Sequence, residues 1–579
     1  MALKKLPYLF LLIKVITIAF LSVLVFILYF HQIDAMLQDL GRHLLFGEII
    51  VQTQHVPTIN LLSYTYPNFP FINTHWLSEV IFYLIEKSTG FFGLLIFTSL
   101  VATMAFLIQL LYLKNIKTLP LLLASVLYFR ILLERTDLRP EIFSFFYMSL
   151  FIVILYKYRE KFTQWIYILP LIELVWINSH IYYPAGIVIL LFFLVDALIT
   201  YRKKIFQKYT LTLFFVLVAT IIATLINPNT INGALYPFNI FHNYGFQIAE
   251  NYNVFQIWNQ LQPKSTILYY FISVPLLFSL MLITFKKTKP IDWFLALFFT
   301  IFAASALRNL PLFVFATFIP FAKSLNSLYG KLFPDKAESF IKVTLYISVC
   351  LFLIWQVKDI ITAHTFGYQM PTEVSKSVDF IQENNIKGPM FNNFDIGSYL
   401  AYRLYPKEKV FVDGRPEAYP ASFFQNIYIP IEQDKTIFQK ADNKYLFNMI
   451  IISHSDLTPS NQQFLRDINA NPNWKLVYLD PTMVIYVKNI PQNKSIKTNI
   501  ITSPNVSSMN FTKQELMQLL AFYQNIGWST EIKVIDNKLL DINPNDCSII
   551  ANLGTILQNE NDQQYLFYAE KYQRLCMKQ

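Results

Sequence analysis

Long apolar runs separated by short polar segments dominate the first 360 residues of the chain. Runs of this kind are typical of α-helices that cross a hydrocarbon layer about 30 Å thick, which takes about 20 residues. The pattern therefore predicts a polytopic all-α membrane domain over residues 1–360, with about eleven transmembrane helices. The predicted spans are 7–30, 91–113, 118–134, 140–157, 164–178, 184–201, 209–227, 267–285, 291–307, 310–323 and 341–358.

The pattern changes after the last apolar run. Amphipathic helical stretches alternate with short apolar strands through residues 361–490, which predicts a small α/β domain with a parallel or mixed sheet. Asn, Ser, Thr and Pro are prominent in residues 491–511, which we interpret as a linker. The expected elements of the α/β domain are a helix at 372–385 and strands near 389–392, 409–412, 447–452 and 475–487.

Residues 512–579 have a mostly helical pattern. The runs 547–557 and 562–577 together resemble one tetratricopeptide-type hairpin, which cannot bury its own apolar face and should pack on a helix at 513–524 or on a protein partner. A plain helical cap on the α/β domain is the alternative. Of the three cysteines, only Cys547 and Cys576 are placed to meet in this region.

Composition and charge fix the class of protein and its orientation. The chain is 54% apolar and only 15% charged, and its net charge is +10. The basic residues punctuate the apolar runs instead of forming one patch, so the charge predicts topology and no nucleic-acid partner. Eighteen basic residues fall on one side of the predicted membrane and six on the other, before the soluble region. This bias predicts a cytoplasmic N-terminus and an extracytoplasmic C-terminal region, and the richness in Ile, Lys, Asn, Tyr and Phe suggests a bacterial cytoplasmic membrane.

The outer face carries the long loops, 31–90 and 228–266, and loops of this kind commonly hold functional sites. Residues 36–52 and 76–86 form amphipathic patterns that predict helices in the interface plane. Helical spacing sets Asp39 and His43 on one face as an i, i+4 pair. An acid beside a base at a helix start is also common on ordinary surfaces, and that alternative stays open.

A second polar cluster, Glu134–Glu141, fills the predicted outer turn between two spans. Five charges in eight residues at a membrane edge are unfavourable unless they pair or bind a ligand. Structural pairing of Arg139 with Glu141 or Asp137 is the alternative to a binding site. Further polar signals stand at other predicted outer helix ends: Trp176–His180, Asn227–Asn229 and Arg308–Asn309.

Acids, imidazoles and guanidinium groups at a lipid boundary suit a reaction on a lipid-linked phosphate. An acid can deprotonate an incoming hydroxyl, while arginine or histidine stabilises a leaving phosphate. In the soluble region, Asp413-Gly414-Arg415 follows a predicted strand, where ligand-binding loops often lie. A glycine turn with a neighbouring salt bridge explains that motif equally well.

These motifs resemble the GT-C superfamily of integral membrane glycosyltransferases, in particular a bacterial branch related to polyprenyl-phosphate-sugar-dependent transferases. The resemblance covers about 480 residues. It rests on Asp39–Leu44, Pro57–Thr65, His75–Glu79, Arg139–Glu141, Trp176–His180, Asn227–Pro228, Arg308–Asn309, Phe391–Leu400 and Val412–Arg415.

The resemblance implies a GT-C-like fold in which an acceptor hydroxyl attacks the anomeric carbon of a polyprenyl-phosphate sugar with inversion. It maps the catalytic base onto Asp39, or onto Asp34 if the first outer loop is registered differently. It makes Glu79, Glu141 and Asp137 candidates for metal or acceptor contacts, with Glu79 and Glu141 also as catalytic candidates. Candidates for substrate and phosphate contacts are His43, His75, Asp137, Arg139, His180, Arg308 and Asn309. The branch usually has Trp where this chain has Arg42, a departure that bears on activity more than on fold.

Three functions remain open at this level. The leading one is a glycosyltransferase with a glycan or protein acceptor and membrane lipid around it. The others are a catalytically inactive GT-C relative that serves as an assembly or binding module, and a lipid or glycan transporter. The resemblance leaves the cofactor open, with a divalent metal as one option.

Overall fold

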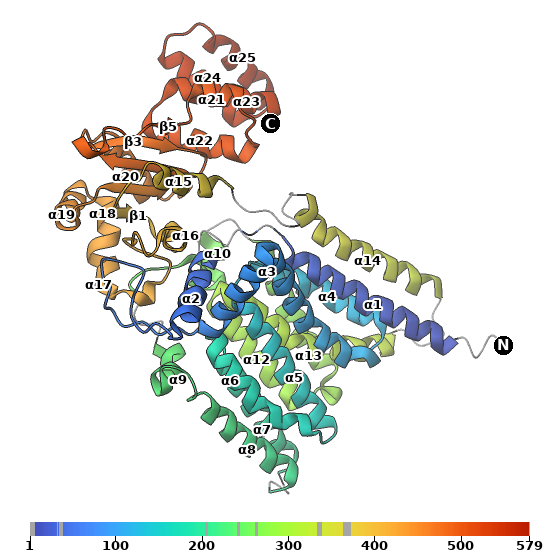
Figure 1. The fold of residues 1–579 in the computed structure, drawn as a ribbon. Helices are drawn as coiled ribbons and strands as arrows, with labels where there is room; N and C mark the ends of the chain where they lie inside the picture. The colour runs from blue at the N-terminus through green and yellow to red at the C-terminus, as the bar shows by residue number, and fades with distance from the viewer. Residues whose placement is uncertain are drawn as a thin grey trace.

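The computed structural model describes residues 6–31, 33, 39–202, 206–239, 244–260, 264–332, 339–362, 367 and 372–577. Figure 1 shows three parts that follow the chain: a bundle of helices, a small sheet flanked by helices over one end of that bundle, and a group of helices at the C-terminal end. The register candidate Asp34 lies outside the described residues.

A helix occupies each of the eleven predicted spans, and the apolar runs therefore predicted the elements of the bundle correctly. These helices are α1 (Leu6–Tyr29), α3 (Trp76–Tyr112), α4 (Thr118–Leu132), α5 (Glu141–Glu160), α6 (Leu169–Ser179), α7 (Pro184–Thr200), α8 (Lys208–Ala223), α11 (Ser265–Ile283), α12 (Pro290–Ser305), α13 (Leu310–Leu332) and α14 (Ser339–Thr362).

Several of these helices are apolar enough to mark the chain as a membrane protein. Among the described residues, five helical segments are long and apolar enough to cross a bilayer, and four shorter ones are similarly apolar. The remaining two, α4 and α6, have 15 and 11 residues and extend only about 22 Å and about 17 Å. The number of full crossings therefore stays a prediction.

The amphipathic segments of the first outer loop form α2 (Leu40–Thr53) and the first part of α3. Residues 76–86 are continuous with the following span across a bend at Gly90, whose φ of 70° suits glycine. Helix α2 lies against α3 at Gly47, where a Cβ atom would stand 2.2 Å from the carbonyl oxygen of Glu79. Glycine at this position therefore lets the two helices approach closely enough to hold the polar groups described below.

The α/β region contains a five-stranded mixed sheet with the order β1-β2-β4-β3-β5. The parallel pairs are β1 with β2 and β3 with β5, whereas β4 runs antiparallel to both β2 and β3. Helix α16 (Phe394–Leu404) connects the sheet to the membrane part by packing on α2. The strands are β1 (Met390–Asn392), β2 (Met449–Ser453), β3 (Trp474–Leu479), β4 (Met483–Lys488) and β5 (Asn499–Ile500), and α15 (Thr372–Glu383), α19 (Lys435–Tyr445) and α20 (Pro459–Asn469) are further helices.

Two strand predictions need correction. Residues 409–412 add no strand to the sheet; instead Val410 forms one parallel bridge with Ser63 of the first outer loop. Its backbone amide donates to Leu62 and its carbonyl accepts from Tyr64, so its hydrogen bonds are made with the membrane part. The segment 475–487 is two strands, because Asp480 accepts amides of the intervening turn. The segment that we interpreted as a linker contains β5 and the helix α21 (Ser503–Ser508).

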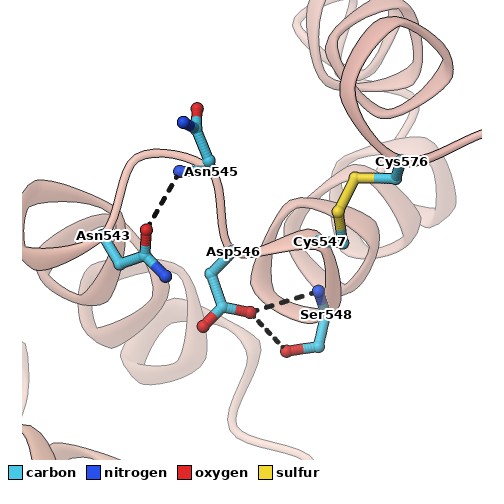
Figure 2. Close-up of a disulfide and its surroundings, with 6 residues drawn as sticks. All are labelled: Asn543, Asn545, Asp546, Cys547, Ser548 and Cys576. Carbon is cyan, nitrogen blue, oxygen red and sulfur yellow. Dashed lines mark hydrogen bonds between the residues drawn. A yellow bond between two sulfur atoms is a disulfide. The ribbon is translucent and has the colours of Figure 1, made fainter. Parts of the chain in front are cut away.

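The C-terminal group consists of α22 (Lys513–Ile526), α23 (Ser529–Ile542), α24 (Cys547–Asn559) and α25 (Tyr565–Cys576). The sequence pattern missed α23, which lies between α22 and α24 in the stack. A disulfide joins Cys547 to Cys576 and ties the two ends of the α24–α25 hairpin, as Figure 2 shows beside the Asp546 cap of α24. The pairing of these two cysteines is confirmed, while the tetratricopeptide likeness stays a prediction.

Candidate functional site

A buried arginine helps to fix the first outer loop to the α/β region, at a contact between Arg415, Asp413, Asn60, Phe46 and Phe71 that we call the Arg415 junction. Arg415 is fully buried and pairs with Asp413 at 2.7 Å, and it also donates to the side-chain oxygen of Asn60 at 2.7 Å. Its guanidinium lies 4.9 Å and 4.7 Å from the ring centres of Phe46 and Phe71. The structure therefore favours the salt-bridge interpretation of the Asp413-Gly414-Arg415 motif over ligand binding.

Beneath this junction, charged side chains from three segments meet at the N-terminal end of α2. We call Arg42, Arg135 and Arg139, with their carboxylate partners, the arginine cluster. The Asp39 carboxylate pairs with Arg42 at 2.8 Å and with Arg139 at 3.1 Å. Its side chain is 21% exposed, whereas those of Arg42 and Arg139 are 8% exposed. The cluster is thus mostly buried but still open to solvent at Asp39.

Glu250 and Glu141 complete the arginine cluster. Glu250, from the turn η7 (Ala249–Asn251), pairs with Arg135 at 2.8 Å and with Arg139 at 2.9 Å. Glu141 accepts from the Nε atom of Arg135 at 2.8 Å, while Asp137 lies 3.8 Å from Arg139. Each of the carboxylates Asp39 and Glu250 therefore has two arginine partners.

These contacts change the pairings expected from sequence. Asp39 bonds to arginines while His43 bonds to Glu79, so the side chains of the expected i, i+4 pair have separate partners. Arg139 pairs with Asp39 and Glu250 more closely than with Asp137, and Glu141 pairs with Arg135. Arg135 and Glu250 were missed as site residues. Their only signal was their position in charged or polar outer segments.

The electrostatic state of Asp39 follows from these neighbours. Burial by itself raises the pKa of the Asp39 carboxyl, but the positive charges of Arg139 and Arg42 outweigh that effect and hold the pKa below its usual range. In this arrangement Asp39 is an ionised partner of the arginines and a weak base.

Three imidazoles form a second group beside the arginine cluster, which we call the histidine stack. The ring centres of His43 and His75 are 5.5 Å apart, and those of His75 and His180 are 5.1 Å apart. The Nδ1 atom of His43 bonds to Glu79 at 2.9 Å, and Asn73 donates to the other oxygen of Glu79 at 2.6 Å. The stack thus joins the first outer loop to the end of α6.

Burial lowers the pKa of all three imidazoles, and neighbouring positive charges lower it further. Arg308 has the strongest such effect on the pKa of His180, and Arg42 on that of His43. The histidine stack is therefore neutral at neutral pH and able to donate and accept hydrogen bonds.

Arg308 and Asn309 close the same region from the turn η9 (Leu307–Asn309). Asn309 accepts from the hydroxyl of Tyr182 at 2.8 Å and donates to the carbonyl of Phe302 at 3.0 Å. The structure thus brings eight of the ten sequence-predicted site residues into the arginine cluster and the histidine stack. Asn309 lies beside the stack through Tyr182, whose ring contacts His180, and Arg308 precedes it in the chain.

A cavity of about 430 Å³ lies next to these groups, between the first outer loop, α9 (Thr230–Asn239) and the 416–421 segment of the α/β region. Among the described residues, no three His, Cys, Asp or Glu side chains are arranged to hold a metal ion. The residues that line the cavity are Phe69, Pro70, Ile72, Tyr236, Asn239, Glu417, Tyr419, Pro420 and Ala421.

No protein-family model matches the chain, and the comparison with curated proteins finds no match. Among solved structures, the chain is similar to the Archaeoglobus fulgidus oligosaccharyltransferase AglB in complex with an inhibitory peptide and a dolichol-phosphate. The identity is 9% and the TM-score is 0.49, over 92% of this chain and 86% of that one.

Two further structures of the Archaeoglobus fulgidus oligosaccharyltransferase show a similar arrangement. The form tethered to an acceptor peptide matches with 10% identity and a TM-score of 0.47, over 82% of this chain and 74% of that one. The apo form matches with 10% identity and a TM-score of 0.46, over 84% and 75% of the two chains.

Proposed function

We propose that this chain is a glycosyltransferase that moves a sugar from a polyprenyl-phosphate donor to an acceptor hydroxyl on the outer face of the membrane, with inversion. The arginine cluster carries this proposal. It gathers three guanidinium groups at the end of a membrane helix bundle, and planar guanidinium forks match the oxygens of a phosphate.

The outer location rests on two observations. Basic residues crowd the opposite side of the predicted membrane, which is the cytoplasmic side by the positive-inside rule. The disulfide between Cys547 and Cys576 suits an oxidising compartment outside the cytoplasm. We therefore propose a multi-pass protein of a bacterial cytoplasmic membrane, with its N-terminus inside and its α/β region outside.

In the structure, carboxylates pair with the guanidinium groups of the arginine cluster. We propose that the donor phosphate displaces Asp39 from Arg42 and Arg139. Because those arginines are what lowers the pKa of Asp39, their transfer to the phosphate returns its pKa toward the usual range and makes it a stronger base. Donor binding would thereby prepare Asp39 for the reaction.

The reaction then has one displacement step. The acceptor oxygen attacks the anomeric carbon while the bond from that carbon to the phosphate oxygen breaks, and the electron pair leaves with polyprenyl phosphate. Asp39 accepts the proton of the acceptor hydroxyl, and the guanidinium groups stabilise the negative charge of the leaving phosphate. Glu79 and Glu141 act as positioning residues, because they hold His43 and Arg135.

The test is release of polyprenyl phosphate from a panel of polyprenyl-phosphate sugars by the purified protein in nanodiscs, with methyl glycosides as acceptors. Asp39→Asn and Arg139→Ala should both lose release. Arg466→Ala is the matched control, because Arg466 is an exposed arginine of α20 that bonds Gln463 of the same helix and Asn525 of α22, outside the arginine cluster. Release that survives in both site variants contradicts the proposal.

A catalytically inactive binding module is the second candidate, and one observation favours it. Asp39 is held by two guanidinium groups, with its pKa lowered, and is a weak base as it stands. For this candidate, the wild-type protein binds the polyprenyl-phosphate sugars through the arginine cluster but releases no polyprenyl phosphate. Binding and release measured on the same nanodiscs therefore separate the two functions.

A further inference from the structure

We propose that the cavity between the first outer loop, α9 and the 416–421 segment binds a neutral saccharide. This inference rests on the proposed function, for which the saccharide is the acceptor glycan. The cavity volume of about 430 Å³ is in the range of small-molecule sites, which is large enough for one or two sugar rings.

The chemistry of the walls fits a sugar. Three aromatic side chains, Phe69, Tyr236 and Tyr419, line the cavity together with the carboxylate of Glu417 and the amide of Asn239. A sugar ring presents apolar C–H faces, which pack on aromatic rings, and a rim of hydroxyl groups, which bond to carboxylate and amide groups. Apolar walls with a few polar groups are the usual construction of a small-molecule site.

Hydrogen bonds within the protein hold the walls in place. The Tyr419 hydroxyl donates to the Asp413 carboxylate at 3.0 Å and accepts from the Asp413 backbone amide at 3.1 Å. Asn60 donates from its side chain to the carbonyl of Ala418 at 3.0 Å and from its backbone amide to the carbonyl of Phe69 at 2.9 Å. Two of the three walls, the first outer loop and the 416–421 segment, are therefore tied to the Arg415 junction, and a preorganised site loses less entropy when it binds.

The charges around Glu417 argue for a neutral ligand. Among the described residues, Glu417 makes no ion pair with an arginine or lysine. Burial raises the pKa of its carboxyl, while the charges of Arg42 and Arg415 act in the opposite direction and show that both lie within electrostatic range. A cationic ligand would meet these two positive charges, and an anionic ligand would meet the carboxylate. A polyol carries no charge, so neither the arginines nor the carboxylate would repel it.

The first outer loop places the cavity beside the candidate site. Ile72 lines the cavity, and the next residue, Asn73, donates to the Glu79 carboxylate at 2.6 Å. Glu79 bonds His43 at 2.9 Å, one turn of α2 after Asp39 of the arginine cluster. A saccharide in the cavity would therefore lie next to the proposed site of the donor phosphate.

The test is saturation-transfer difference NMR of the full chain in nanodiscs. The probes are methyl α-mannopyranoside, methyl β-galactopyranoside and methyl N-acetyl-β-glucosaminide, with choline as a cationic probe. The wild-type protein should transfer saturation to at least one glycoside and give no transfer signal for choline. Glu417→Gln, which preserves side-chain volume, and Tyr236→Ala should each lower the signal at least fivefold, whereas the exposed Glu383→Gln should leave it unchanged.

Two results overturn the inference: no glycoside is saturated by the wild-type protein, or both Glu417→Gln and Tyr236→Ala keep the full signal. Arg139→Ala separates this inference from the proposed function, because it alters the arginine cluster and leaves the walls of the cavity intact. Glycoside binding by a wild-type protein that releases no polyprenyl phosphate supports the cavity and contradicts the transferase. Release of polyprenyl phosphate by a wild-type protein that binds no glycoside contradicts only the proposed saccharide site.

Discussion

The Arg415 junction and the arginine cluster contain the same kind of ion pair in two different settings. Arg415 and Asp413 are fully buried, and the guanidinium is enclosed by two aromatic rings and an asparagine. In the arginine cluster, Asp39 is 21% exposed and shares its charge between Arg42 and Arg139. Asp413 therefore has one arginine partner, whereas Asp39 has two.

This difference indicates different roles. Breaking a buried pair with one partner leaves an uncompensated charge in a low-dielectric surrounding, so such a pair fixes structure. The Asp39 carboxylate is partly exposed, so water can solvate it when its arginines move to a ligand, and such a cluster can exchange partners at lower cost. The number of partners and access to solvent, more than the residue types, distinguish a structural arginine from a binding one.

The largest effect should come from Arg415→Ala. This change leaves the Asp413 carboxylate buried without its arginine and removes the contact with Asn60, which should lower the free energy of unfolding by about 3–5 kcal/mol. Thermal unfolding in detergent measures the loss. Arg466→Ala, on the exposed face of the α/β region, is the control and should cost less than about 0.5 kcal/mol. Equal losses in the two variants would erase the distinction between the regions.

Arg139→Ala should separate activity from stability. Asp39 keeps Arg42 and Glu250 keeps Arg135, while Asp137, which loses its contact at 3.8 Å, is 35% exposed and stays solvated. The unfolding free energy should therefore fall by only about 1 kcal/mol. Polyprenyl phosphate release should fall about 100-fold, in line with the loss of one group that stabilises transition-state charge. A stability loss as large as that of Arg415→Ala would assign Arg139 a structural role instead.

Mild acid tests whether the histidine stack, unlike the arginine cluster, makes the fold sensitive to acid. The folded pKa of His43, His75 and His180 is lowered, so below about pH 6.5 the unfolded state binds protons that the folded state excludes. The contribution of these imidazoles to stability should therefore be full above pH 6.5 and fall as the pH decreases, by up to about 1.4 kcal/mol per pH unit for each imidazole. Glu79 acts in the opposite direction, because burial raises the pKa of its carboxyl to about 7 and the folded state binds that proton first.

Asp39 contributes no such loss between pH 7 and pH 5, because its folded pKa is lowered and its stabilising effect is lost only at more acidic pH. Unfolding midpoints measured from pH 7.5 to pH 5 check this difference. His75→Asn should flatten the profile, and His55→Asn, at an exposed position, should leave it unchanged. If Asp39→Asn flattens the profile as strongly as His75→Asn does, the acid sensitivity lies in the arginine cluster.

The smallest effect should come from Arg42→Lys. Lysine keeps the positive charge near Asp39 but loses the planar fork that bonds two oxygens at once. Because Arg139 remains in place, polyprenyl phosphate release should fall by less than about tenfold, or about 1.4 kcal/mol. Initial rates at several donor concentrations measure this change, which should affect the KM more than the kcat. If this variant has wild-type kinetics, Arg42 does not belong to the proposed phosphate site.

Local periodicity was enough to predict most of the fold. The apolar runs predicted every long helix of the bundle, and the pattern also predicted β1, β2 and α15, because each depends on its own residues. The strand expected at 409–412 failed for the opposite reason. Val410 has the side chains of a strand, but its hydrogen-bond partner lies in the first outer loop, about 350 positions earlier in the chain.

The candidate site shows the same limit. Sequence reasoning found Asp39 and Arg139 as separate signals, yet their pairing joins residues about 100 positions apart and no local pattern encodes it. Arg135 was part of a motif already noted, but nothing ranked it above its neighbours. Glu250 and Glu417 stand in ordinary polar segments and acquire their importance only from the arginines that the fold brings near them.

The Arg415 junction also has a consequence for how this protein can diverge over generations. Residues 410–419 and the loop containing Asn60 and Phe71 share backbone and side-chain bonds, so a substitution on one side changes what the other side must supply. We expect the two segments to be inherited together and to covary among descendants. A recombinant that receives the outer domain of a distant relative should fail to assemble unless it also receives the matching loop.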